Sequence, residues 1–202
     1  MKKWAAAILV VGAMISSGSS FGQGTFYFVN ISGGLVDAPV FDSDGSRLSG
    51  ANYVAMLYGG PTSDSLQPAL DQVGLAFSPE PFREGTFAGY FARTGYVQIP
   101  NVPSLFPWLQ VRAWDSRLGS TYEAVKALGI GGYGESNLFQ KQGGNPSGLP
   151  SPPEPLIGLQ SFNLVPEPSA FLLILVGVPL LLLGKRRFKR IRTPQRTISS
   201  QR

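Results

Sequence analysis

The stretch Leu109-Gln110-Val111-Arg112-Ala113-Trp114-Asp115 alternates apolar and polar side chains and decides the fold class. A period of two places successive side chains on opposite faces of an extended chain, so this stretch predicts a half-buried β-strand. Other runs are rich in aromatic and β-branched residues and end near glycine-containing turns, which predicts further strands. These runs are 25–31, 53–58, 86–91, 96–99 and 158–165.

Local signals add a hairpin and one short helix to these strands. The runs 86–91 and 96–99 flank Arg93-Thr94-Gly95, which predicts a β-hairpin between them. Ser120-Thr121-Tyr122-Glu123 forms a capping box, and Gly129 is placed to end the helix that follows it. One helix is therefore expected among the strands.

The spacing of these signals favours an all-β ectodomain. Turns recur at short intervals and no long helical period lies between residues 23 and 164. We expect a β-sandwich-like ectodomain, with an immunoglobulin-like outline as one form of it, rather than a parallel α/β sheet. The Gly- and Pro-rich segment 143–155 has no periodicity and predicts a loop.

The amino-acid composition removes most catalytic chemistry. The 202 residues contain no His and no Cys, which excludes Ser-His and Cys-His nucleophiles, disulfides, and zinc sites of imidazole or thiolate. Paired carboxylates remain open for glycoside hydrolysis, with Glu80, Glu84, Asp115 and Glu123 as candidates, but no spacing marks a pair. We therefore expect no catalytic residue, no cofactor and no metal site.

Two short motifs have both a functional and a structural interpretation. Asp42-Ser43-Asp44-Gly45 begins like a calcium loop but lacks the later ligands, so it favours an Asx turn that joins two strands. Trp108 and Trp114 are candidate residues for stacking on sugar rings, with packing in the core or at its rim as the alternative.

The charge of the chain is unevenly placed. It has 17 Lys plus Arg against 12 Asp plus Glu, a formal net charge of +5. Seven basic and eleven acidic residues lie in 23–164, so this region has a net charge of −4. The remaining basic residues gather at the two ends, where they indicate topology signals, and nucleic-acid binding is not expected.

Residues 1–22 predict a secretory signal peptide. Two lysines precede a twelve-residue apolar run at 4–15, and small residues follow it. These small residues place the signal peptidase cut between Gly22 and Gln23. The apolar run is too short to span about 30 Å of hydrocarbon comfortably, which argues against a retained anchor.

A second apolar run predicts a transmembrane helix at 169–184. Its uncharged residues span about 24 Å at 1.5 Å per residue, and flanking residues extend this length to that of a bilayer core. A basic segment at 185–192 follows, and then a tail at 193–202, which the positive-inside rule places in the cytoplasm. The stop-transfer cluster consists of Lys185, Arg186, Arg187, Lys189 and Arg190.

Pro166-Glu167-Pro168 directly precedes this apolar run. The order of parts over 165–192 resembles the PEP-CTERM sorting signal of Gram-negative bacteria. The resemblance implies that an exosortase, a membrane-embedded enzyme similar to a cysteine transpeptidase, recognises and cuts the Pro-Glu-Pro segment. Pro153-Glu154-Pro155 repeats the tripeptide, but the residues after it are too few and too polar to span a membrane.

Together these observations predict a signal peptide (1–22), a β-rich ectodomain (23–164), a sorting signal (165–192) and a cytoplasmic tail (193–202). The region 26–164 is also similar to the Gly-rich ectodomains of PEP-CTERM proteins, a resemblance that transfers no activity. We expect export, a transient single-pass stay in the inner membrane with the ectodomain in the periplasm, and delivery to the cell surface or extracellular matrix.

The expected function is structural or adhesive and non-enzymatic. The expected partners are signal peptidase, an exosortase and membrane lipid, with exopolysaccharide as a further one. A carbohydrate-binding module is the alternative function, and a carboxylate-dependent glycoside hydrolase is a less favoured one.

Overall fold

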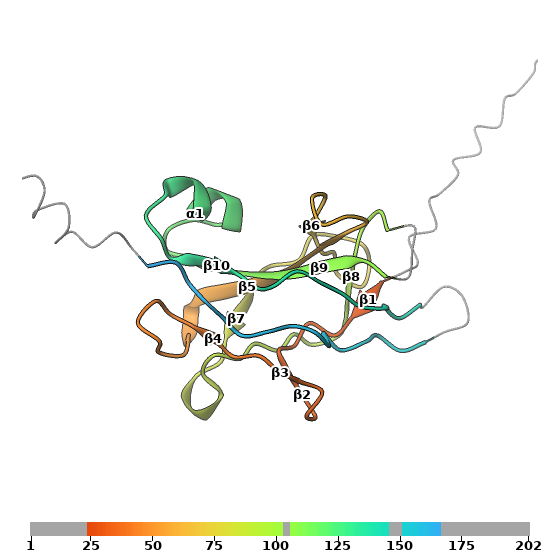
Figure 1. Ribbon diagram of the computed structural model, residues 1–202, viewed down its shortest axis with the longest axis horizontal. Coiled ribbons are helices and arrows are strands. Elements are labelled where there is room, and N and C mark those ends of the chain that lie inside the picture. Colours follow the sequence, from red (N-terminus) through yellow and green to blue (C-terminus); the bar gives the residue numbers. More distant parts are fainter. Residues whose placement is uncertain (1–23, 103–105, 146–150, 167–202) are drawn as a thin grey trace, which may run out of the picture.

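Two long antiparallel strands, β5 (Gly50–Gly60) and β9 (Trp108–Asp115), form the centre of the fold (Figure 1). The computed structural model describes residues 24–102, 106–145 and 151–166. Within them the two strands pair continuously, from Tyr53 opposite Asp115 to Gly60 opposite Trp108. The strands predicted at 53–58 and 109–115 are therefore confirmed.

Shorter strands extend this pair into a six-stranded sheet. β10 (Tyr133–Glu135) and β11 (Phe139–Gln140) pair with β9, while β6 (Gln67–Pro68) and β7 (Glu80–Phe82) pair with β5. Three two-stranded ladders complete the β structure: β1 (Thr25–Phe26) with β8 (Val97–Gln98), β2 (Ile31–Ser32) with β3 (Val36–Asp37), and β4 (Val40–Phe41) in parallel with β12 (Phe162–Asn163). The described residues thus confirm a β-rich fold.

Alternation along β5 and β9 divides the buried residues between the two faces of the sheet. Odd-numbered residues of both strands, from Ala55 to Leu57 and from Leu109 to Ala113, belong to the larger apolar cluster. Figure 1 shows β2, β3 and β4 on that side of the sheet and the helix on the other. The smaller cluster on the helix side contains Val54, Tyr58, Trp114, Tyr122 and Val125.

The only helix longer than one turn in the described residues is α1 (Tyr122–Leu128), and its position confirms the predicted short helix. Its N-cap is Thr121, whose hydroxyl accepts a hydrogen bond from the Ala124 backbone N–H at 3.2 Å. The capping box predicted from Ser120 is therefore wrong by one residue. Gly129 ends the helix with a φ of 67°, the left-handed conformation that glycine adopts readily.

One arginine fastens α1 to the sheet. The Arg112 guanidinium lies 4.1 Å from the centre of the Tyr58 ring and 5.0 Å from that of Tyr122. It also donates a hydrogen bond of 3.0 Å to the Glu123 carboxylate, which accepts a second from the Tyr58 hydroxyl. Because the rings and the carboxylate come from both elements, this cluster fixes how the helix lies on β5 and β9.

The hairpin predicted between 86–91 and 96–99 is wrong. Residues 85–87 form a 3₁₀ turn, η1 (Gly85–Phe87), and β8 pairs with β1 instead. Gly89, at a φ of 85°, donates its N–H to Leu48 and packs against Pro39 and Val40. The chain after η1 therefore forms backbone hydrogen bonds with the segment around β4, a long-range contact that the local spacing of residues does not predict.

Two other predicted strands are shorter than expected. The run 25–31 divides into β1 and the start of β2, and the run 158–165 contains only the two residues of β12. The predicted loop at 143–155 holds no strand in its described residues. It pairs locally with β1 through isolated bridges from Gly144 and Glu154.

Asn30 explains why the first run divides. Its side chain is fully buried, its amide nitrogen donates to the carbonyls of Ala38 and Gly89 at 2.8 and 2.9 Å, and its amide oxygen accepts from the Phe91 N–H at 2.7 Å. One side chain therefore satisfies three backbone groups of two distant segments. A continued strand through residue 30 could not supply these bonds.

Replacing Asn30 with Ala should lower the free energy of unfolding by about 2–4 kcal/mol. The buried Ala38 carbonyl and Phe91 N–H lose their partner, while the Gly89 carbonyl keeps its hydrogen bond from the Val40 N–H. Urea unfolding followed by tryptophan fluorescence measures this loss. Asn52→Ala is the matched control, since Asn52 is exposed and its side chain makes no hydrogen bond to the described residues. Equal stabilities of the two variants would contradict this role of Asn30.

Candidate functional site

The last described residues of the chain are tied to the body up to the start of the Pro-Glu-Pro motif. Leu164 donates its N–H to the Phe41 carbonyl at 2.9 Å, Val165 donates to Tyr133 at 2.7 Å, and Gly132 donates to Val165 at 3.0 Å. Pro166 follows directly and is exposed. The junction between the body and the predicted sorting signal therefore contains no linker.

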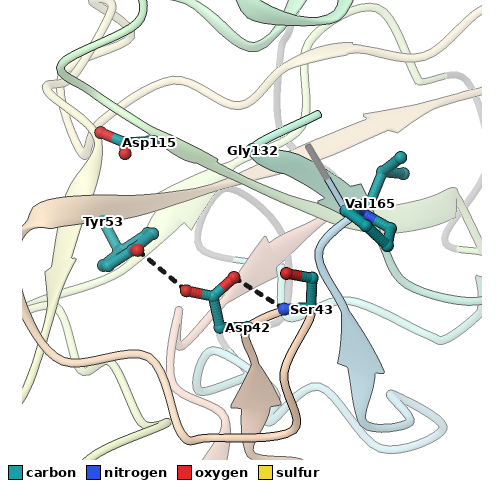
Figure 2. Close-up of a pocket in the computed structure, with 7 residues that line it drawn as sticks. Asp42, Ser43, Tyr53, Asp115, Gly132 and Val165 are labelled. Atoms are coloured by element: carbon teal, nitrogen blue, oxygen red, sulfur yellow. Dashed lines mark hydrogen bonds between the residues drawn. The ribbon is translucent and has the colours of Figure 1, made fainter. Parts of the chain in front are cut away.

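A cleft of about 230 Å³ opens beside this junction. Figure 2 shows its lining residues, which come from the turn after β4, from β5, from the end of β9 and from the chain before Pro166. They are Asp42, Ser43, Tyr53, Asp115, Gly132, Val165 and Pro166. The antiparallel register of β5 and β9 brings Tyr53 opposite Asp115 and so joins residues far apart in sequence.

Asp42 and Tyr53 form one polar pair in the cleft. The Tyr53 hydroxyl donates to the Asp42 carboxylate at 2.9 Å, and the Ser43 N–H donates to its other oxygen at 2.6 Å (Figure 2). Burial and the hydrogen bond to Asp42 raise the pKa of Tyr53 to about 12. The phenol is therefore a hydrogen-bond donor at neutral pH, and it does not act as a base.

Asp115 forms the second pair, with Arg117. The side chain of Asp115 is 5% exposed, and it accepts hydrogen bonds from the Arg117 backbone N–H at 2.9 Å and from its guanidinium. These hydrogen bonds hold the pKa of the Asp115 carboxyl below its usual range, although burial acts in the opposite direction. Asp115 is therefore ionised at neutral pH and neutralised by one neighbouring cation.

The two carboxylates of the cleft, Asp42 and Asp115, do not have the arrangement that a glycosidase needs. A glycosidase acid needs a raised pKa and a second carboxylate with a free face. Here Asp115 has a lowered pKa, and Asp42 already accepts two hydrogen bonds. The described residues hold no group of three or more acidic side chains placed to bind a metal ion.

The other candidate carboxylates do not join this cleft. Glu123 lies on α1 and forms an ion pair with Arg112 of β9. Glu80 lies on β7, and its carboxylate is 3.7 Å from the Arg93 guanidinium. Burial raises the pKa of Glu80, against the attraction of Arg93. Glu84 precedes η1 and borders Gly50. The structure therefore gives each carboxylate a different neighbourhood and brings no two of the four together.

The two tryptophans that were candidates for sugar stacking differ in exposure. Trp114 is 1% exposed, and its ring N–H donates to the Gly119 carbonyl at 3.1 Å. Its ring has no free face for a sugar, so the stacking prediction for Trp114 is wrong and core packing is correct. Trp108 is half-buried at the start of β9.

Asp42-Ser43-Asp44-Gly45 is a turn, as the sequence favours. Gly45 donates its N–H to the Asp42 carbonyl at 3.0 Å, and Ser46 donates to the Asp44 carboxylate at 2.8 Å. The hydrogen bonds from Ser46 lower the pKa of Asp44. The turn leads from β4 back to Arg47, which forms an isolated antiparallel β-bridge with Phe41.

A second cavity, of about 290 Å³, lies near β8. Its lining consists of Leu70, Gly74, Gln98, Ile99, Pro100 and Asn101, a set of aliphatic and amide groups with no ionisable side chain. We name these six residues the amide groove. Figure 1 shows β8 and β1 at one end of the long axis, while the chain near residue 165 reaches the other end.

Most of the predicted processing residues lie outside the described residues. Gly22 and Gln23, Glu167 and Pro168, the helix at 169–184 and the basic cluster at 185–192 belong to this group. No helix within the described ranges is long and apolar enough to cross a bilayer. Pro166 alone represents the sorting motif in the described structure.

Comparison of the chain with models of protein families, with curated proteins and with solved structures finds no match. No known relative therefore indicates a function for the cleft or for the amide groove. The sequence places Asp42 in a turn but does not connect it with Tyr53, and it marks no residue of the amide groove as functional, because no local spacing connects positions that only the fold brings together.

Asp115 should make stability fall in acid. Because its folded pKa lies below the unfolded value of about 3.9, its contribution is present above that value and is lost as the pH falls through the folded pKa. Asp115→Asn should remove about 0.5–1 kcal/mol of this pH dependence between pH 6 and 3, since exposed Arg117 weakens the pair.

Urea unfolding at a series of pH values measures this effect. Asp64→Asn is the control, because Asp64 is exposed and bonds to the neighbouring Ser63 hydroxyl instead of a cation. If Asp115→Asn and the parent chain lose stability equally on acidification, the Asp115–Arg117 pair does not act as described.

Proposed function

We propose that this chain is an exported protein that is sorted through its C-terminal segment and then serves at the cell surface or in the extracellular matrix. The observation that supports this best is the junction: the described body bonds to its own chain up to Val165, and the Pro-Glu-Pro motif begins at the next residue. A cut in the motif would release a complete β-rich body and nothing more.

The arrangement of charges supports the same route. The signal-like segment 1–22 and the basic cluster at 185–192 hold the positive charge, and the region between them is weakly acidic. Signal peptidase, an exosortase and membrane lipid are the proposed processing partners. The ectodomain would lie in the periplasm until the motif is cut.

The second tripeptide supports the choice of cut site. Glu154 donates its N–H to Thr25 at 3.2 Å, its carbonyl accepts from Tyr27 at 3.0 Å, and its carboxylate lies 3.4 Å from Lys141. Pro153-Glu154-Pro155 is therefore part of the body. An enzyme that reads a Pro-Glu-Pro segment would find this copy bonded to its neighbours.

We propose a structural or adhesive role for the released domain, without enzymatic activity. Its candidate carboxylates are separated, and three of them, Glu80, Asp115 and Glu123, are each paired with an arginine, which supports this role over that of a glycoside hydrolase. A sandwich outline is part of the proposal: the six-stranded sheet would form one layer, and the ladders of β4 with β12 and of β1 with β8 would contribute to the other.

The amide groove supports carbohydrate binding as the second candidate function. Aliphatic walls suit the C–H faces of sugar rings, and amides donate to and accept from hydroxyls. Gln98 and Asn101 supply these amides, and each uses its nitrogen for an internal bond, to Gln72 and Gln67. An uncharged lining favours a neutral polysaccharide. Gln98 of the groove belongs to β8, which lies toward the end of the body away from the junction (Figure 1).

Glu167→Gln should prevent release of the domain and leave the precursor in the inner membrane. The substitution removes the motif's only charge and keeps its size. Glu154→Gln is the matched control, since it makes the same change in the second tripeptide and should be processed like the parent chain. The C-terminal mass of protein recovered from membrane and medium measures both.

An end near residues 166–168 in the parent and in Glu154→Gln, but not in Glu167→Gln, is the expected result. Pro166→Ala should accumulate in the membrane in the same way. An intact Arg202 in every fraction of the parent chain would make this a single-pass membrane protein and refute the proposal.

Gln98→Ala combined with Asn101→Ala should weaken retention of the domain by a neutral polysaccharide about tenfold or more, because two hydrogen-bonding groups of the groove are lost. Affinity electrophoresis in gels that contain a neutral or an acidic polysaccharide measures this. Gln140→Ala, at an exposed position of β11, is the control. Equal migration of all variants in every gel would remove carbohydrate binding at this groove.

A further inference from the structure

The residue before the sorting motif has no free backbone group. The Val165 N–H donates to Tyr133 at 2.7 Å, and its carbonyl accepts from Gly132 at 3.0 Å, so both groups pair with the chain at β10. The preceding N–H, from Leu164, is bonded to Phe41. The backbone is thus hydrogen-bonded to the body up to the residue that precedes Pro166.

Side chains hold the same segment in place. We name residues 156–165 the C-terminal strap. Its leucines, Leu156, Leu159 and Leu164, are 0%, 8% and 2% exposed. The Asn137 side chain donates to the Gly158 carbonyl and accepts from the Gln160 N–H, both at 2.9 Å. The strap is therefore anchored along most of its length.

The strap also lies very close to β10. A β-carbon at Gly134 would stand 2.6 Å from the Asn163 carbonyl oxygen and 3.1 Å from the Leu164 Cα, a separation that real side chains do not tolerate. Glycine at this position is what lets the strap lie against the strand. No further chain can enter between them while the strap is bound.

An enzyme that cuts a peptide needs the opposite arrangement. Extended segments are commonly recognised by pairing their backbone N–H and C=O groups with the edge of a binding site. Two residues of the motif are prolines and have no N–H, which leaves Glu167 as the only donor within it. Backbone recognition upstream of the motif must therefore use Leu164 and Val165, whose N–H groups the body already occupies.

From this we infer that the folded body withholds the backbone that precedes its own processing site, so that the motif is cut only while the end of the C-terminal strap is detached from β4 and β10. This inference rests on the proposed function, because it concerns the same cut. The substrate of the sorting enzyme is then the chain with a loose strap, either before the strap docks or during its transient release.

The central experiment separates the motif from the body. Six residues, Gly-Ser-Gly-Ser-Gly-Ser, are inserted between Val165 and Pro166 in the full-length precursor, and the appearance of the cut product is followed by pulse-chase in cells that carry an exosortase. We expect cutting at least about tenfold faster than in the parent, since the enzyme no longer waits for the strap to open. The same insertion between Gly33 and Gly34, at an exposed turn, should have no effect.

A point substitution tests the strap without changing the spacing. Leu164→Ala should loosen the end of the strap and also speed the cut, while Val125→Ala weakens the smaller cluster, which contains no residue of the strap. Resistance of the purified domains to protease establishes that both variants fold. Equal acceleration by both substitutions would mean that general instability controls the rate, and would overturn the inference.

The outcomes separate this inference from the proposed function. If the parent chain is never cut near 166–168, the proposed sorting route fails. If the parent is cut and the insertion before Pro166 leaves the rate unchanged, sorting stands and the closed junction is refuted. Faster cutting in the insertion and in Leu164→Ala, with both controls at the parent rate, supports the inference.

Discussion

The pairing of β5 with β9 is the constraint on which the rest of the structure depends. Its unbroken register sets which residues face the larger core and which face α1. Because successive side chains of a strand point to opposite faces of the sheet, each strand contributes alternate residues to the two sides. If β9 slipped by one residue against β5, Val111 would turn toward the helix and Arg112 toward the apolar core. The same register places Tyr53 opposite Asp115 and so creates one wall of the cleft beside the junction.

Charges in the body are few and mostly serve it locally. Arg112 holds α1 through two aromatic rings and Glu123, and Arg117 neutralises Asp115. Such pairs add little net stability when exposed, but they use up the groups that catalysis would need. An apolar core without disulfides supplies the stability, as the absence of Cys requires.

Elements with a strong local pattern could be predicted from the sequence. The alternation at 109–115, the β-rich run at 53–58 and the helix that ends at Gly129 all appear in the structure. The predictions failed where a distant partner decided the outcome. Residues 86–91 have strand composition, yet Gly89 and Phe91 bond to Leu48 and to the Asn30 side chain. Trp114 was a candidate for sugar stacking because the residues next to it in sequence do not show that a later helix buries its ring.

The sequence by itself determined that the fold is rich in β structure, since periodicity and turn residues are local properties. The position of its apolar and charged runs predicts the order of the segments. The sequence also excluded histidine and cysteine chemistry outright. Only the tertiary structure decided which residues line the cleft beside the junction, where the amide groove forms and how tightly the C-terminal strap lies against β10. Those features join positions such as 42, 53, 115 and 165, and their proximity follows from strand register and long-range backbone pairing.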